Sequence, residues 1–284
     1  MSRPIPSSPQ HSATLLIGRL WDGHPALPSE AILVRLVPDG EGRITLDGER
    51  VRAIEQALGS CAEAGCRVLV IAGGEGQFCR GMDLAELLTR QDRAAALQAD
   101  LAAYATCIRA IAAGPVAVVC LVDGEVLGGG VGLMAACDIV LATERASLAL
   151  PELTVGLVPA VVLPVLQRRV GVHRARYLSL RGARVSAEQA QTWGLIDTVV
   201  DATDELEKQL RRELKGLLRT RPEAVARLKQ INEIAATSSL TEGLAAGVAR
   251  TAADMVEPEV VAAVTAMAEG ELPPWFTRYR KRAH

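Results

Sequence analysis

Three consecutive glycines interrupt the most apolar part of the chain. Gly128, Gly129 and Gly130 follow the apolar run from Val116 to Val122, and the sequence GLMAAC that comes next is typical of a helix start. Glycine lets a backbone approach a ligand closely, and the free N–H groups at a helix N-terminus point toward negative charge. Such a turn can stabilise a developing oxyanion. A tight strand-to-helix turn without a ligand would fit the same glycines.

A second glycine turn lies upstream. The segment RVLVIAGG, Arg67 to Gly74, predicts a buried strand, and after a polar loop Gly81 precedes a short helix that we expect to begin near Asp83. Two strand ends that are each followed by a glycine turn and a helix start can each supply one backbone N–H to a single carbonyl oxygen.

The order of these motifs resembles the crotonase family, also called the enoyl-CoA hydratase/isomerase family. The resemblance covers about Ala13 to Ile231 and includes an A-x-x-W-G-L-I-D segment from Ala190 to Asp197. The other motifs, in chain order, are an F-x-x-G-x-D loop, a D-G-x-x-x-G-G-G turn, a C-D-I-V-x-A-T-E strand, and an L-P-E segment followed by G-L-x-P.

The resemblance implies a fold and the oxyanion hole of a catalytic site. The implied fold is α/β, a crotonase-like ββα superhelix with a helical C-terminal part, in subunits that form trimers or hexamers. The family's oxyanion hole corresponds to the amides of Met82 and Gly129, with Gly81 and Gly128 beside them as substrate-binding residues.

The chain departs from the family pattern at one of two glutamates. Hydratases of the family use one glutamate in the helix after the triple glycine, where this chain has Gly132, and one at the position of Glu152. A single carboxylate can move a proton away from the carbon next to a thioester, or pass it to a leaving hydroxyl on the same face. The apolar neighbours of Glu152 predict a raised carboxyl pKa; a glutamate that caps a helix or pairs with an arginine is the alternative. We expect Gly132 to leave room for a substrate branch, unless it is a helix-packing glycine.

A finer resemblance concerns the dehydratases of polyketide β-branching cassettes. It rests on G-M-D, A-T-E-R-A-S-L-A-L-P-E and G-L-V-P-A-V-V-L-P, where Ala160 to Pro164 replace a glycine-rich stretch of typical hydratases. It implies dehydration of 3-hydroxy-3-methylglutaryl to 3-methylglutaconyl on the phosphopantetheine of an acyl carrier protein, or on CoA, with no other cofactor. An enoyl-CoA hydratase or isomerase that uses one glutamate, and a non-catalytic protein that binds an acyl carrier, remain open.

Charged residues near the motifs have two interpretations each. Asp83 could orient a leaving hydroxyl, but we favour a cap on the helix that follows it. Arg80, Arg90 and Arg93 could bind a distal substrate carboxylate, because a planar guanidinium suits that partner, or they could be solvated surface charges.

Composition predicts a soluble cytoplasmic enzyme. The chain has 284 residues, 49% of them hydrophobic, and a net charge of −2, which argues against a nucleic-acid partner. No apolar run is long enough to span a membrane, and the four histidines offer no metal cluster. Because the first twelve residues are Pro/Ser-rich rather than apolar, we expect no signal peptide. Six cysteines without metal spacing predict reduced thiols, and we expect Cys79 and Cys137 to be packed.

The resemblance and the periodicity together predict four segments: a flexible N-terminus (1–12), a core that resembles the crotonases (13–200), a helical part (201–268) and a basic tail (269–284). The tail would be disordered, or would contact an acidic carrier or CoA phosphates. In the core we expect parallel strands with helical crossovers, and a capping box at Ser186 and Gln189. Expected strands are 14–20, 31–37, 67–71, 116–122 and 138–142, and expected helices are 47–64, 95–113, 130–136, 206–218, 224–231 and 240–253.

Overall fold

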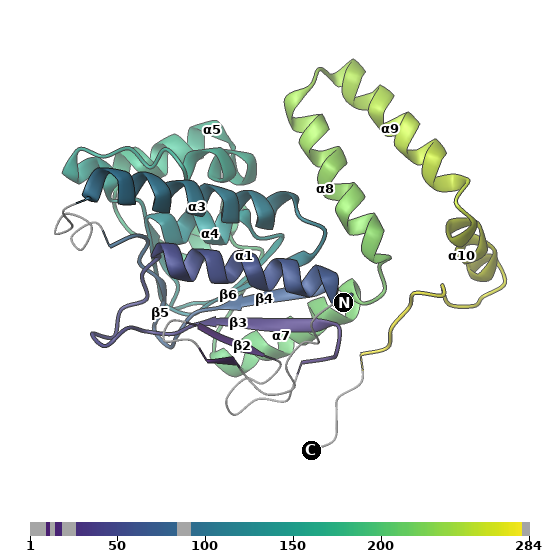
Figure 1. Cartoon of the computed structure of the whole chain (residues 1–284), viewed down its shortest axis with the longest axis horizontal. Coiled ribbons are helices and arrows are strands. Elements are labelled where there is room, and N and C mark those ends of the chain that lie inside the picture. Colours follow the sequence, from purple (N-terminus) through teal and green to yellow (C-terminus); the bar gives the residue numbers. More distant parts are fainter. Residues whose placement is uncertain (1–9, 12–14, 19–26, 84–91, 280–284) are drawn as a thin grey trace.

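The computed structural model describes residues 10–11, 15–18, 27–83 and 92–279, which form an α/β fold with two sheets (Figure 1). The larger sheet has the order β1-β2-β3-β4-β6-β8-β11 and the smaller has the order β10-β9-β7-β5. The strands are β1 (Gln10–His11), β2 (Leu15–Gly18), β3 (Ala31–Leu36), β4 (Val68–Ala72), β5 (Gln77–Cys79), β6 (Ala117–Val122), β7 (Glu125–Leu127), β8 (Ile139–Thr143), β9 (Ser147–Ala149), β10 (Val185–Ser186) and β11 (Thr198–Val200). The helices are α1 (Gly48–Glu63), α3 (Arg93–Ala113), α4 (Gly129–Ala136), the 3-10 turn η1 (Glu152–Val155), α5 (Leu163–Arg181), α6 (Ala187–Thr192), α7 (Thr203–Leu217), α8 (Pro222–Thr237), α9 (Leu240–Met255) and α10 (Pro258–Ala268).

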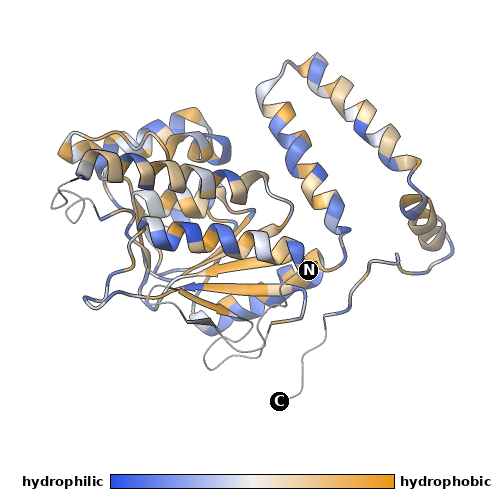
Figure 2. Ribbon diagram, in the orientation of Figure 1, coloured by the Kyte–Doolittle hydropathy of each residue, from blue (hydrophilic) through white to orange (hydrophobic). Residues whose placement is uncertain are grey.

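Continuous apolar runs build the centre of the larger sheet. Every residue of β4 and of β6 is buried, as expected for parallel strands that are covered on both faces (Figure 2). Pairing from β3 through β4, β6 and β8 to β11 is parallel. The predicted parallel sheet with helical crossovers is therefore confirmed, and β1 and β2 extend it with antiparallel pairing.

Helices cover both faces of this sheet. On one face α1, α3 and α4 contribute side chains to the main core cluster. On the other face lies α7, where Leu206, Leu210 and Leu214 recur every four residues and are at most 1% exposed. This stripe packs on Val70 and Leu121 of the sheet. The central strands are thereby shielded from water on both sides.

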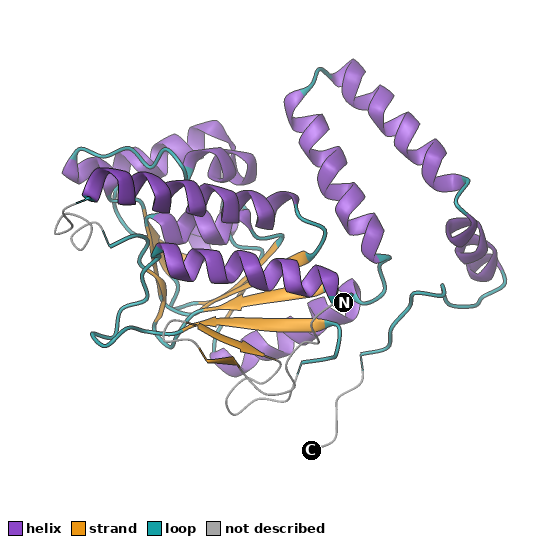
Figure 3. Ribbon diagram, viewed as in Figure 1, coloured by secondary structure: helices purple, strands orange, loops and turns teal. Residues whose placement is uncertain are grey.

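The smaller sheet was not expected from the sequence (Figure 3). From the sequence we expected the first glycine turn after a polar loop that follows β4, and the second after β6, but each turn follows a further short strand, β5 or β7. Sharp turns cause the difference: Gly124, between β6 and β7, has a φ of 97°, a backbone conformation that favours glycine. Strands β5, β7 and β9 pair in parallel, and β10 pairs with β9 in the antiparallel sense.

Local capping was predicted in part. The Ser186 hydroxyl accepts a hydrogen bond from the Gln189 N–H at 3.3 Å and caps α6. A complete capping box forms instead at Ser239 and Glu242, at the start of α9. No helix of the described chain is long and apolar enough to cross a bilayer.

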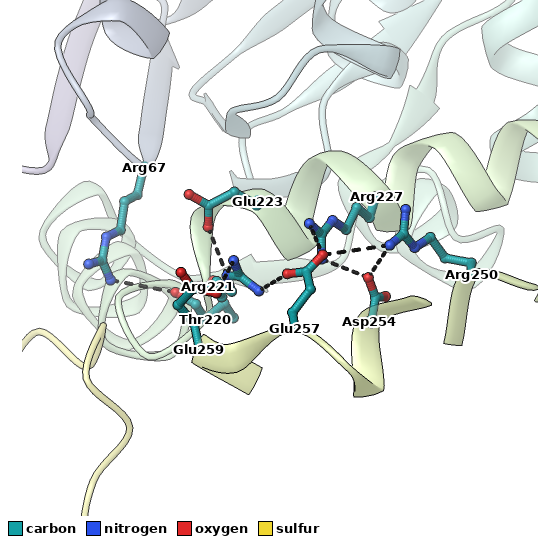
Figure 4. Close-up of polar contacts among 9 residues, drawn as sticks. All are labelled: Arg67, Thr220, Arg221, Glu223, Arg227, Arg250, Asp254, Glu257 and Glu259. Atoms are coloured by element: carbon teal, nitrogen blue, oxygen red, sulfur yellow. Dashed lines mark hydrogen bonds and ion pairs between the residues drawn. The ribbon is translucent and has the colours of Figure 1, made fainter. Parts of the chain in front are cut away.

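Helices α8, α9 and α10 form an arm that extends away from the sheets (Figure 1). Ion pairs hold its helices together (Figure 4): the Arg221 and Arg227 side chains of α8 and its N-cap each lie 2.6 Å from the Glu257 carboxylate before α10. Arg227 also pairs with Asp254 of α9 at 2.6 Å. Because Glu257 faces two guanidinium groups, the pKa of its carboxyl is lowered.

The tail is not free where the structure describes it. The Thr277 N–H donates to the Leu218 carbonyl at 3.1 Å. Tyr279 packs against the apolar cluster that lies between α7 and the larger sheet. The Arg219 and Arg221 guanidinium groups lie over the rings of Phe276 and Trp275. The expectation of a disordered tail is therefore wrong as far as Tyr279; residues 280–284 lie outside the described chain.

A buried lysine joins the arm to the core. Lys229 of α8 is 7% exposed, and its ammonium donates to the carbonyls of Ile111 and Val116 at 2.9 Å each. It also lies 2.7 Å from the Asp138 carboxylate. Since these groups belong to the end of α3 and the starts of β6 and β8, Lys229 attaches α8, the first helix of the arm, to the core.

We expect Lys229→Met to lower the free energy of unfolding by about 2–3 kcal/mol, because two carbonyls and a carboxylate lose their donor. Lys208→Met is the matched control, since that lysine pairs with Glu205 on the exposed face of α7 and should change stability far less, because water screens the pair. Urea unfolding of both variants measures the difference. Equal losses would show that the buried contacts of Lys229 do not stabilise the fold.

Candidate active site

Three segments meet at the carboxyl ends of parallel strands. Strand β5 leads to Gly81, β7 leads to Gly128 and Gly129, and β9 leads to Glu152. The Gly128 N–H donates to the Ala149 carbonyl at 3.0 Å, which ties the second segment to the third. This edge of a parallel sheet is where α/β proteins commonly bind ligands.

The two glycine turns touch each other. Gly81 has a φ of 77°, and a Cβ on it would lie 2.7 Å from the Gly129 nitrogen and 3.0 Å from the Leu127 oxygen. Only glycine fits this contact. The next residue, Met82, lines the same cavity as Gly129. Within the described chain, neither amide is engaged in a backbone hydrogen bond of a turn or loop. Two amides can thus face one ligand oxygen.

Glu152 begins η1 and lines this cavity. Its Oε1 lies 3.1 Å from where a Cβ on Gly128 would be, and Gly128 has a φ of 53°. Its Oε2 is buried without a hydrogen-bond partner among the described residues, and the side chain caps no helix. Burial raises the pKa of this carboxyl. The alternative of a capping or arginine-paired glutamate therefore finds no support in the described chain.

The cavity beside Glu152 has a volume of about 530 Å³. Leu97, Leu101 and Tyr104 line it from one face of α3, and the segment from Leu157 to Val162, which leads into α5, lines it as well. This segment includes Ala160, Val161 and Val162, where the sequence differs from typical hydratases. The acyl part of a ligand would therefore meet a largely apolar wall.

Charged groups also line the cavity, and each has a partner. The Arg80 Nε lies 3.2 Å from the Glu125 carboxylate, so this candidate for a distal substrate carboxylate is already paired. Asp83 forms an ion pair with Arg43 at 3.2 Å. The helix that Asp83 was expected to cap lies outside the described residues, as do Arg90 and the side chain of Arg93. Arg43 lines the cavity and was missed, because its position lies outside every motif.

Gly132 corrects the sequence interpretation. Its expected role was to leave room for a substrate branch, but a Cβ on Gly132 would overlap the Tyr104 hydroxyl and lie 3.0 Å from Val162 Cγ2. The chain itself therefore fills this space. Sequence reasoning missed Tyr104, which lies on α3, far from the motifs in sequence.

We expect Gly132→Glu to lower stability and block turnover, because the new side chain must displace the Tyr104 hydroxyl and bury a charge. The variant Gly132→Glu with Tyr104→Ala should recover part of the lost stability, since the overlap is removed. Thermal melts of the single and double variants measure this coupling. Additive losses would contradict the packing of Tyr104 against Gly132.

The two cysteines of the motifs are packed, as expected. Burial raises the pKa of the Cys79 thiol to about 12, and its sulfur accepts a hydrogen bond from the Gly81 N–H at 3.4 Å. The Cys137 thiol donates to the Leu133 carbonyl at 3.3 Å. Cys79 thus helps to shape the first glycine turn, and both thiols are buried.

Known proteins with the same architecture identify the family. The family model for enoyl-CoA hydratase/isomerase matches residues 43–278. The bacillaene synthase dehydratase PksH of Bacillus subtilis (strain 168) is 33% identical over 190 residues, which cover 67% of this chain and 72% of PksH. The mevalonyl-coenzyme A hydratase sidH of Aspergillus fumigatus is 36% identical over 135 residues, 47% of this chain and 49% of sidH. The chain therefore spans about half the length of sidH.

Solved structures agree. Pseudomonas aeruginosa AtuE superposes with a TM-score of 0.80 at 28% identity, and the match covers 93% of this chain and 100% of AtuE. An enoyl-CoA hydratase from Bacillus anthracis gives a TM-score of 0.78 at 26% identity over 87% of this chain and 95% of that one. The chain is thus an enoyl-CoA hydratase-like enzyme that belongs to the crotonase, or enoyl-CoA hydratase/isomerase, family and has its fold.

Proposed function

We propose that this enzyme is a lyase that dehydrates a branched 3-hydroxyacyl thioester, 3-hydroxy-3-methylglutaryl on an acyl carrier protein, to the 3-methylglutaconyl thioester. One observation carries the proposal: Glu152 presents a buried, partnerless carboxylate oxygen, while Tyr104 fills the space at Gly132 where two-glutamate hydratases hold their other carboxylate. Among the described residues, the site therefore offers Glu152 as its unpaired carboxylate and no second carboxylate at position 132.

The proposed mechanism needs no second base. The thioester carbonyl accepts hydrogen bonds from the amides of Met82 and Gly129, which stabilises the enolate. Glu152 removes a proton from C2, and the electron pair of that bond forms the enolate. As the enolate collapses, the C3–O bond breaks and Glu152 returns the same proton to the leaving hydroxyl. One water and one C2–C3 double bond result, and the carboxylate is restored.

The named activities of relatives support this substrate class. PksH is described as a dehydratase of bacillaene synthase, and sidH as a mevalonyl-coenzyme A hydratase. A mevalonyl group carries a hydroxyl and a methyl on C3, as the proposed substrate does. We assign the distal carboxylate of that substrate to Arg80, which would share its guanidinium with Glu125.

The proposed enzyme is a homotrimer or a pair of trimers. Its arm exposes many large apolar side chains, which would be costly to leave in water: Leu228, Leu240, Leu244, Val248, Met255, Val256, Val261, Val264 and Met267. A reducing compartment such as the cytoplasm suits it, because its six cysteines are free and buried.

Mass spectrometry of the acyl group tests the function. The enzyme is incubated with 3-hydroxy-3-methylglutaryl and with a 3-enoyl group, each on an acyl carrier protein and on CoA. Loss of one water from the branched substrate, faster on the carrier protein than on CoA, is the expected result. Movement of the double bond without dehydration would identify an isomerase. Binding of the carriers with no chemistry on any substrate would identify a non-catalytic carrier-binding protein.

A further inference from the structure

We propose that Tyr104 is a positioning residue: its hydroxyl holds the first turn of α4 so that the Gly129 amide points at the thioester oxygen. This inference rests on the oxyanion hole of the proposed function, Met82 and Gly129, but not on the identity of the acyl group.

The hydroxyl reaches the turn that carries the oxyanion donor. Tyr104 is 2% exposed, and its Oη donates to the Gly129 carbonyl at 2.5 Å. Its ring carbon Cζ lies 3.6 Å from where a Cβ on Gly129 would be. Tyr104 therefore reaches Gly129 from another helix, α3, and contacts both its carbonyl and the face where a side chain would be.

Backbone bonds hold one side of this turn: the Val131 N–H donates to the Gly128 carbonyl at 2.9 Å, and the Gly128 N–H donates to the Ala149 carbonyl at 3.0 Å. Helix α4 begins after Gly128, which makes no side-chain capping bond, and consecutive glycines leave the backbone many accessible conformations. Leu46 and Gly81 approach Gly129 only at van der Waals distance, 3.5 and 3.6 Å from the Cβ position. Such contacts restrict position but do not orient a peptide group, whereas a hydrogen bond does. Tyr104 supplies such a bond to the following peptide group, at the Gly129 carbonyl, and so holds Gly129 from its other side.

The Tyr104 hydroxyl stays protonated while Glu152 acts as a base. Burial raises the pKa of the phenol well above its ordinary value, and the nearby Glu152 charge raises it further. The group therefore remains a neutral donor throughout the range in which a carboxylate can act as a base. It does not compete with Glu152 for the substrate proton.

Gly132 makes this contact possible. The Tyr104 hydroxyl occupies the volume of a side chain at position 132, so a carboxylate there and the tyrosine contact exclude each other. The glycine at position 132 therefore does two things: it removes the second glutamate, and it leaves the space that the Tyr104 hydroxyl needs to reach Gly129.

The test measures polarisation of a bound carbonyl directly. A cinnamoyl thioester, which has no 3-hydroxyl to lose, is labelled with ¹³C at its carbonyl, and the shift of its infrared stretch on binding is compared between wild type and Tyr104→Phe. We expect the shift to fall by at least half in the variant. Exchange of the C2 protons of a saturated acyl thioester into heavy water should slow on the order of tenfold to a hundredfold, while binding of the thioester changes less.

Two variants separate positioning from general stability. Tyr177→Phe removes a hydroxyl that accepts from Arg181 on the surface of α5 and should leave the shift and the exchange rate unchanged. In Tyr104→Phe with Gly132→Ala, the new methyl fills the vacated space, so the melting temperature should recover while the carbonyl shift stays low. The single variant Gly132→Ala, which pushes the hydroxyl aside, should also reduce the shift.

The outcomes distinguish the two proposals. A full wild-type shift in Tyr104→Phe, or a shift that recovers together with stability in the double variant, would overturn the role of Tyr104 alone. A wild-type enzyme that binds the probe without any carbonyl shift would overturn the oxyanion hole, and Tyr104 with it. A normal shift in an enzyme that releases no water from any 3-hydroxyacyl thioester would overturn only the proposed dehydration, and the loss of shift in Tyr104→Phe would still support its positioning role.

Discussion

Glu152→Gln is expected to lower kcat by about a hundredfold to ten-thousandfold, the usual contribution of a positioned acid or base. Glutamine keeps the size of the side chain but cannot take the C2 proton, and the described site offers no second carboxylate at position 132 to replace it. Steady-state kinetics on the branched thioester measure the loss. Glu144→Gln, an exposed change near the end of β8, is the control and should keep wild-type kcat.

The same variant should not be less stable than wild type at neutral pH. Burial raises the pKa of the Glu152 carboxyl, so the folded state holds this proton more tightly than the unfolded chain does. The stability that this proton contributes is full below the unfolded pKa and is lost as pH rises through the folded pKa. Turnover has the opposite dependence, since only the carboxylate is a base: the acid limb of kcat should lie above the ordinary glutamate pKa and disappear in Glu152→Gln. A folded variant that retains more than half of the activity would remove Glu152 from the mechanism.

The long elements could be predicted from the sequence because each one spans enough residues to show its own hydrophobic pattern. The buried runs Val68–Ala72 and Ala117–Val122 and the helix Gly48–Glu63 were predicted to within one or two residues. Strands β5, β7 and β9 have three residues each, too few for any period to emerge. Their pairing depends on the turns at Gly124 and elsewhere, so the sheet that carries the site could not be predicted.

The parts of the candidate site that lie within a single segment, the backbone amides and the carboxylate, were predicted. The part that forms where two helices pack together was missed. The glycine turns and Glu152 follow from local motifs. The packing of Tyr104 against Gly132 depends on how α3 crosses α4, which is tertiary information. Seen alone, the glycine at position 132 indicated empty space; in the fold, a tyrosine 28 positions earlier fills it.

The identity of the residue at position 129 should decide whether the oxyanion hole forms. A Cβ on Gly129 would lie 3.5 Å from Leu46 Cδ1 and 3.6 Å from both Gly81 Cα and Tyr104 Cζ. These are ordinary contacts, so Gly129→Ala fits, and as a helical residue alanine costs less backbone entropy than glycine. We expect this variant to keep kcat/KM within about tenfold of wild type, because its amide can still polarise the carbonyl.

Gly129→Val should behave differently. Its two γ-carbons extend beyond the Cβ toward the same three neighbours. The end of the Leu46 side chain can move aside, but the backbone of Gly81, which carries the turn to Met82, cannot shift without moving the Met82 amide. Valine therefore pushes apart the two amides that must face one oxygen, and kcat/KM should fall on the order of a hundredfold to a thousandfold. Kinetics per folded site, with the folded fraction taken from thermal melts, separate this effect from lost stability. Equal kinetics for the alanine and valine variants would contradict the steric argument, and a bound thioester whose carbonyl points away from Met82 and Gly129 would refute the oxyanion hole itself.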